Sequence, residues 1–183
     1  MKFLLLLVCS LLILTFAGVA SAQSQNEVTG VALYVRENPD FNQPNFKYNK
    51  ATDQVGAAGS YSRFAATAPI GITVEVADTA TGSSATDANL ATVTAGITLK
   101  SRTAKFAPFL KGEVGVARLA ARNQLVKFDR TDSGFAMIAG AGVDVKLTKL
   151  VSVRLVEVEY LGTRIFSDTV PHFRAGSGLV FSF

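Results

Sequence analysis

Nine charged side chains lie within stretches that are otherwise rich in apolar residues and glycine. One residue separates the two charges in Lys111 and Glu113, and again in Glu157 and Glu159. In an extended strand such residues point to the same face. Acids and bases enclosed together must pair, because an isolated buried charge is very costly. We therefore expect an ion-pair network of Glu75, Lys111, Glu113, Asp144, Lys146, Arg154, Glu157, Glu159 and Arg174.

The segments around these charges alternate with a period of two, which is typical of β-strands. In residues 135–147 every odd position is apolar, whereas Asp144 and Lys146 fall at even positions. Residues 28–36 and 55–65 also resemble strands, but the pattern does not assign their faces. The full set of eight expected strands is 28–36, 55–65, 70–76, 90–100, 108–116, 135–147, 151–161 and 173–183.

Residues 151–161 break this alternation, because Arg154 has the opposite parity to Glu157 and Glu159. A β-bulge adds one residue to a strand and so restores parity beyond it. A bulge near Leu155 and Val156 would bring all three charges to one face.

Glycines are expected to make room for these long side chains. A hairpin centred near Lys149 would place Glu157 opposite Gly142, and Glu159 opposite Gly140. The last segment offers Gly176 and Gly178 at a similar height.

The first 22 residues have the pattern of a cleaved signal peptide. Lys2 is followed by an apolar run over residues 3–16, and Ala20-Ser21-Ala22 forms a small-residue cleavage site, so the mature chain should begin at Gln23. The apolar run is shorter than the roughly 20 residues of a spanning helix. Cleavage would remove Cys9, the single cysteine, so the mature chain would form no disulfide.

The mature chain, residues 23–183, has the length of a single domain. The full chain has a formal net charge of +4, which falls to +3 without Lys2, and no run of Lys or Arg occurs, so nucleic-acid binding is not expected. No later segment is apolar for long enough to form a spanning helix. A secreted apolar chain of this kind fits a membrane only as a closed β-barrel whose apolar face meets lipid.

Connection lengths alternate along the chain. Short ones are expected at 67–69, 101–105 and 148–150, and longer polar ones at 37–54, 77–88, 123–132 and 167–171. Bacterial outer-membrane barrels have short periplasmic turns and longer extracellular loops. The sequence therefore predicts an all-β fold, an eight-stranded antiparallel up-and-down transmembrane β-barrel with both termini on the periplasmic side. Eight strands leave an interior just wide enough for side chains.

Three segments carry a resemblance to a known family: KFAPFLKGEVGVA (105–117), FAMIAGAGVDVKLTKLVSVRLVEVEYLGTR (135–164) and HFRAGSGLVFSF (172–183). They resemble the OmpA-like transmembrane domain, or outer membrane protein beta-barrel domain, family in a short, barrel-only form. The resemblance implies integral location in the outer membrane of a Gram-negative envelope. Phe183, with Phe181 and Leu179, resembles the terminal signal that the barrel assembly machinery reads.

Catalysis is not expected. His172 is the only histidine, so a histidine metal cluster is not expected. Some small outer-membrane barrels are lipid A hydrolases, but this chain has Arg174 where that type would place a serine, two residues after the histidine. We expect His172 to be an exposed loop residue, and we expect no catalytic, cofactor-binding or metal-binding residues.

The expected function is structural, or an interaction at the cell surface, with the lumen plugged by ion pairs. The protein should be a monomer in outer-membrane lipid, and the sequence does not identify the partner of its extracellular loops. A narrow porin or small-solute channel is the first alternative. A lipid A-modifying enzyme and a soluble ligand-binding barrel are the others.

Overall fold

A computed structural model describes residues 25–37, 53–66, 68–81, 86–101, 105–123, 128–165 and 168–183. The expected signal peptide, residues 1–22, lies outside the described residues, and its cleavage remains a prediction.

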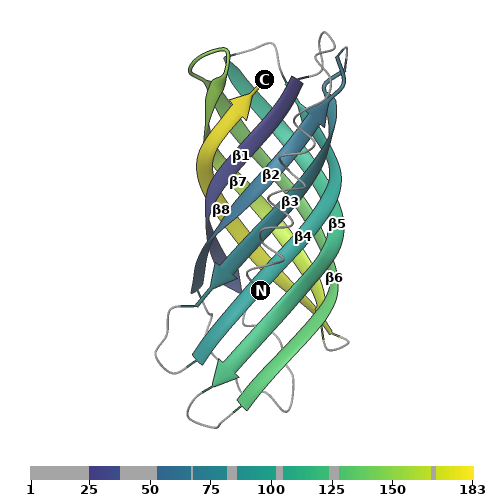
Figure 1. Cartoon of the computed structure of the whole chain (residues 1–183), viewed down its shortest axis with the longest axis vertical. Helices are drawn as coiled ribbons and strands as arrows, with labels where there is room; N and C mark the ends of the chain where they lie inside the picture. Colours follow the sequence, from purple (N-terminus) through teal and green to yellow (C-terminus); the bar gives the residue numbers. More distant parts are fainter. Residues whose placement is uncertain are drawn as a thin grey trace.

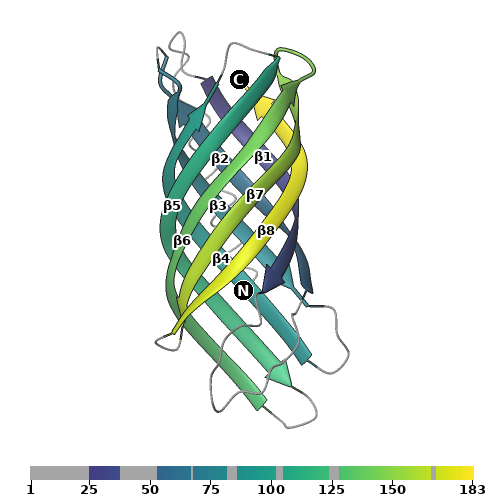
Figure 2. The ribbon, with the colours of Figure 1, turned by 180° about the vertical axis from the view of Figure 1, so that it is seen from behind.

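Eight strands form one closed antiparallel barrel, in which each strand pairs with the next and β1 also pairs with β8 (Figure 1). The strands tilt steeply around the barrel axis, and the start of β1 and the C-terminus lie at the same end (Figures 1 and 2). The predicted fold class is therefore confirmed. The strands are β1 (Gln25–Glu37), β2 (Asp53–Phe64), β3 (Ile70–Ala80), β4 (Thr86–Lys100), β5 (Phe106–Asn123), β6 (Phe128–Lys146), β7 (Val151–Ile165) and β8 (Asp168–Ser182).

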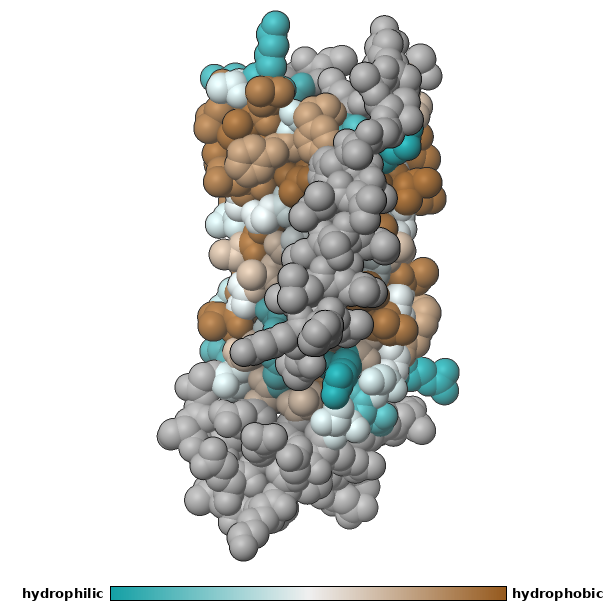
Figure 3. Space-filling model, viewed as in Figure 1, coloured by the Kyte–Doolittle hydropathy of each residue, from teal (hydrophilic) through white to brown (hydrophobic). Residues whose placement is uncertain are grey.

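The outer face of the barrel is apolar and the inner face holds the polar residues. Along β3, buried and exposed residues alternate without a break: Ile72 and Val74 are exposed, and Glu75 is buried. On the side shown in Figure 3, apolar residues cover much of the wall and hydrophilic ones gather toward its ends. On β5 the exposed apolar positions run from Phe106 to Val116. At about 3.3 Å per residue and a tilt of about 40°, this stretch spans about 25 Å, the height of an outer-membrane apolar band.

The faces of the first two strands, which the sequence left unassigned, follow the same rule. β1 turns Val31, Leu33 and Val35 into the barrel and exposes Tyr34. β2 turns Gln54 and Phe64 inward. Its small residues (VGAAGSYS) are similar on both faces, which explains why the pattern was weak there.

The predicted β-bulge in β7 is confirmed. The pairing of β7 with β6 shifts register beside Asp144, and its pairing with β8 shifts between Arg154 and Glu157. Leu155 and Val156 both face outward, and Arg154 and Glu157 both face inward.

The short turns lie where they were expected, but three of the predicted long loops are wrong in extent. β3 continues to Ala80 and β4 starts at Thr86; β5 and β6 are separated by residues 124–127; and β8 already begins at Asp168. The polar residues near these turns belong to strand ends, because pairing continues beyond the apolar band. Residues 38–52 remain the one long connection between strands.

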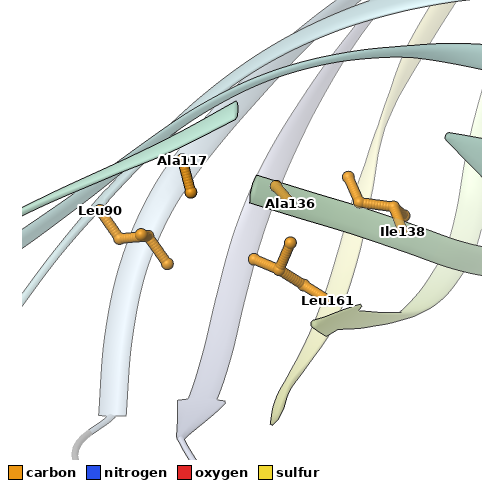
Figure 4. Close-up of a cluster of buried hydrophobic side chains, with 5 residues drawn as sticks. All are labelled: Leu90, Ala117, Ala136, Ile138 and Leu161. Atoms are coloured by element: carbon orange, nitrogen blue, oxygen red, sulfur yellow. The ribbon is translucent and has the colours of Figure 1, made fainter. Parts of the chain in front are cut away.

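Part of the lumen is apolar. Five buried side chains from β4 to β7 pack together in a lumenal apolar cluster: Leu90, Ala117, Ala136, Ile138 and Leu161 (Figure 4). A second cluster joins Val31, Leu33, Ala58 and Ala77 on the first three strands. No helix in the described part of the chain is long and apolar enough to cross a membrane.

The lumenal apolar cluster generates a stability prediction. Leu161 is 0% exposed, so Leu161→Ala should leave a cavity and lower the free energy of unfolding by about 2–4 kcal/mol. Urea unfolding in lipid vesicles measures this. The matched control is Leu110→Ala, because Leu110 is 59% exposed on the outer wall and its loss leaves no cavity. Equal losses in the two variants would contradict a packed lumen.

Candidate functional site: the charged lumen

The barrel brings eight of the nine predicted charges to buried positions on the inner face. They come from β3, β5, β6, β7 and β8. Two further buried charges, Glu27 on β1 and Lys100 on β4, join them. These residues form a central group around Lys111 and a second group around Asp144.

Lys111 lies among four glutamates. Its Nζ is 2.5 Å from Glu75 Oε2, 2.9 Å from Glu157 Oε1 and 3.9 Å from Glu113 Oε1, and it also contacts Glu159 Oε1. Lys111 belongs to β5 and Glu75 to β3, so this pair bypasses the strand between them. A single ammonium thus joins three strands through the middle of the lumen.

Arg174 supplies the second cation of the central group. Its Nε donates to Glu159 Oε2 at 2.5 Å, and one terminal nitrogen lies 2.8 Å from Glu75 Oε1 and also contacts Glu159. Glu75 on β3 and Arg174 on β8 face each other across the lumen, because β1 and β2 lie between them in the wall. Charge-assisted pairs of this kind are strong when both partners are held in a fixed geometry.

Arg154 links the two groups. It donates to both oxygens of Asp144, at 2.9 and 3.3 Å, and to Glu157 Oε2 at 3.0 Å. Its guanidinium carbon lies 4.2 Å from the ring centroid of Phe109, within the range of a cation–π contact. The pair with Glu157 depends on the bulge, since residues three apart in a regular strand point to opposite faces.

Glu27 and Lys100 extend the group around Asp144 and were missed at the sequence level. Lys100 Nζ lies 2.6 Å from Glu27 Oε2 and 2.8 Å from Asp144 Oδ2. Lys100 has the same parity as the inward-facing Thr94 and Thr98, so this signal was present in the sequence. Glu27 precedes the expected first strand, whose faces were unassigned.

Lys146 is the one predicted charge that is not fully buried. It lines the mouth at the end of the barrel that holds the C-terminus, with Lys149 and Ser152, around an open cavity of about 580 Å³. Glu27 and Lys100 form the floor of the same cavity. Lys146 therefore belongs to the entrance of the lumen.

The predicted register of glycines against the glutamates is confirmed on β6, and on β8 Gly176 lies opposite Glu157 and Gly178 opposite Arg154. Glu157 lies opposite Gly142, and Glu159 opposite Gly140. A Cβ at Gly140 would lie 3.0 Å from Glu159 Cγ and 3.4 Å from Lys111 Cε, so its absence makes room for an ion pair.

Two other glycines make room for apolar side chains. A Cβ at Gly142 would lie 2.5 Å from the Phe109 ring. The absence of a side chain at Gly142 therefore leaves room for this ring, whose face Arg154 contacts. A Cβ at Gly176 would meet Val31 and Leu33.

Neutral hydroxyl groups complete the polar lining. Thr94 donates to Glu113 Oε2 at 2.5 Å. Toward the end that holds the C-terminus, the hydroxyls of Ser62, Thr73 and Thr98 follow one another at 2.8 and 2.7 Å. These bonds join β2, β3 and β4 on the inside, in addition to the backbone ladder.

The prediction that His172 is an exposed loop residue is wrong. β8 begins before it, and His172 faces the lumen with 5% exposure. Its Nε2 lies 3.2 Å from Thr163 Oγ1. The neighbouring Pro171 suggested a loop, but it stands inside the strand.

Three carboxylates, those of Glu75, Glu157 and Glu159, have oxygens within 4.8 Å of one another, a spacing that would suit a metal ion. Lys111 contacts all three, and Arg174 contacts Glu75 and Glu159. The cationic side chains of the protein thus already occupy the surroundings of this cluster.

Comparisons with known proteins agree with this geometry. Residues 9–181 match the model of the outer membrane protein beta-barrel domain family. The chain belongs to this family. It is a bacterial outer-membrane protein, as are the solved barrels that it resembles. None of the curated proteins matches its sequence.

Three solved structures share the fold of this family member. Neisserial surface protein A has a TM-score of 0.70 at 12% identity, over 86% of this chain and 97% of its own. Ail, the attachment invasion locus protein of Yersinia pestis, has a TM-score of 0.59 at 17% identity, over 88% and 99%. The N-terminal barrel of Pseudomonas aeruginosa OprF has a TM-score of 0.52 at 18% identity, over 88% and 100%.

The close packing of the Phe109 ring against Gly142 generates a prediction for this outer-membrane barrel. Gly142→Ala should lower the free energy of unfolding by about 1–3 kcal/mol, because the new methyl group overlaps both the ring and the Val156 carbonyl oxygen. Gly112→Ala is the matched control, since nothing lies within 4 Å of a Cβ there. Unfolding in urea compares the two, and a Gly142→Ala barrel as stable as the control would contradict the described packing.

Proposed function

We propose that this protein is a monomeric, non-enzymatic outer-membrane barrel with a structural or surface-interaction role, and that ion pairs close its lumen. The observation that carries the proposal is the position of Lys111, whose ammonium lies among four carboxylates in the middle of the barrel. With Arg174 reaching from β8 to Glu75 on β3, charged side chains cross the lumen in more than one direction.

The energetics of buried charge support a closed lumen. Removing one partner of a buried pair leaves the other without compensation and costs several kcal/mol. An ion passing through would have to separate Lys111 or Arg174 from glutamates that are almost completely buried. These groups therefore favour a fixed plug over an open path.

The lumenal apolar cluster provides a second barrier. Leu90, Ile138 and Leu161 are 3% exposed or less, so their side chains fill this part of the lumen and narrow any path for a hydrated ion. A hydrophobic constriction gates ion flow by excluding water. A solute would have to pass both the charged groups and this cluster.

The central group generates the next prediction. Replacing both Glu157 and Glu159 with Gln should lower the free energy of unfolding by about 3–5 kcal/mol, because Lys111, Arg154 and Arg174 then lose carboxylate partners. Thermal unfolding in detergent, followed by the gel shift between folded and boiled chains, measures the change. Asp53→Asn is the control at an exposed position. An unchanged unfolding temperature in the double variant would contradict a stabilising ion-pair network.

Single-channel recording in planar bilayers separates the plug from its alternative, the narrow porin. The native protein should give no steady ion-selective openings, whereas a stable conductance at neutral pH would favour the porin. A permeable Glu157→Gln, Glu159→Gln variant beside a silent native barrel would locate the block at the central group.

A surface role is supported by the position of the long connection. Residues 38–52 connect the end of β1 to the start of β2, at the end of the barrel opposite the C-terminus, which is the extracellular end if the short turns are periplasmic. Ail has been solved in complex with the heparin analogue sucrose octasulfate. A sulfated glycan is therefore a reasonable first probe for native cells and for cells whose protein has a shortened 38–52 segment.

The C-terminal residues generate a prediction about assembly. Leu179, Phe181 and Phe183 are exposed on the outer face at the end of β8, where assembly factors could reach them before closure. Deleting Phe183 should reduce the folded fraction in the outer membrane of cells several-fold, yet leave refolding in detergent almost unchanged. Phe106→Ala is the control, because Phe106 is an exposed aromatic residue on β5, outside the last strand. Equal losses in cells and in detergent would argue against a recognition signal.

A further inference from the structure

Charge is distributed unevenly along one edge of the apolar band, the edge at the end of the barrel opposite the C-terminus. This is the extracellular edge if the short turns are periplasmic. On β1 and β2, the outward-facing Arg36 lies directly opposite Asp53. On the next two strands, Asn89 donates to Asp78 at 2.6 Å. On this half of the edge a carboxylate thus lies opposite the arginine or accepts from the neighbouring amide.

The other half of the edge carries two arginines, Arg118 on β5 and Arg164 on β7. Both are exposed on the outer wall. Neither forms an ion pair with any carboxylate whose side chain the structure describes. In contrast, both buried arginines of the lumen are paired with carboxylates.

The two arginines flank one strand. Arg118 lies opposite Ser133 on β6, and Arg164 lies opposite Phe135, two residues along the same strand. With about 4.8 Å between neighbouring strands, their Cα atoms are about 10 Å apart across the sheet and about 7 Å apart along it. Two arginine side chains that lean over β6 can reach a single group from this distance.

On the membrane side of the two arginines, the outer wall of the barrel is aromatic. Phe135, Tyr160 and Phe173 are exposed there, and the rings of Tyr160 and Phe173 meet edge to face at 5.7 Å. Gly162 lies between Arg164 and Tyr160, and Met137 covers it. Apolar chains that hang from a bound headgroup would meet this surface.

We propose that Arg118 and Arg164 bind a phosphate group of lipid A in the outer leaflet, with its acyl chains against Phe135, Tyr160 and Phe173. Guanidinium groups match phosphate oxygens in a bidentate geometry. The phosphate is that of lipid A, because lipid A joins phosphate to several acyl chains at the leaflet that this edge of the barrel faces.

The test is native mass spectrometry of the folded full-length chain in neutral detergent, titrated with bisphosphorylated lipid A, dephosphorylated lipid A and phosphatidylglycerol. Native protein should retain bisphosphorylated lipid A about tenfold more tightly than the other two, as two interfacial arginines would provide. The Arg118→Gln, Arg164→Gln variant should lose this preference, and Arg118→Lys, Arg164→Lys should recover part of it. Arg36→Gln, which replaces the arginine opposite Asp53 on the other half of the edge, should bind like the native chain.

Three results would overturn the proposal. The glutamine variant could keep the native preference; dephosphorylated lipid A could bind equally well; or phosphatidylglycerol could match lipid A, which would make the edge a general anionic-lipid surface. The cold gel shift of each variant verifies folding, and both arginines lie on the outer wall, away from the lumenal groups. A conducting barrel that still prefers bisphosphorylated lipid A would reject the closed lumen and leave this proposal standing.

Discussion

The closure of the hydrogen-bond ladder is the constraint on which the rest of this structure depends. In lipid, an unpaired backbone group has no water to bond, so the first and last strands must meet, and β1 indeed pairs with β8 over residues 27–37 and 172–182. Closure divides every strand into a lipid face and an enclosed face. The enclosed face is narrow, so charges placed there have only each other as partners.

The enclosed face is organised along the barrel axis. The group around Asp144 fills the part nearest the C-terminus, the group around Lys111 fills the central part, and apolar clusters lie beyond them. Small residues set the spacing between these layers: Gly140 admits an ion pair, and Gly142 admits an aromatic ring. The lumen is therefore packed as a protein core is, although its composition is partly that of a surface.

The sequence predicted the strand number, most strand faces, the bulge and the register of Glu157 and Glu159, because alternation and charge parity are local properties. It did not predict where strands end, since pairing beyond the membrane follows from the neighbouring strand and not from apolar pattern. His172 shows this limit: Pro171 suggested a loop, but β7 extends far enough to hold both residues in the sheet. Glu27 and Lys100 meet only after closure, across 73 positions of chain.

The bulge at Leu155 and Val156 gives β7 an unusual sensitivity to chain length. Most strands tolerate an added or lost residue near their ends, where a loop absorbs the change. Here the extra residue lies between Arg154 and the two glutamates along the strand. It keeps the side chains before and after the bulge on the same inner face. Losing a single residue would turn either Arg154 or both glutamates toward lipid. During divergence, substitutions at these two outward positions should therefore be common, and deletions there should be rare.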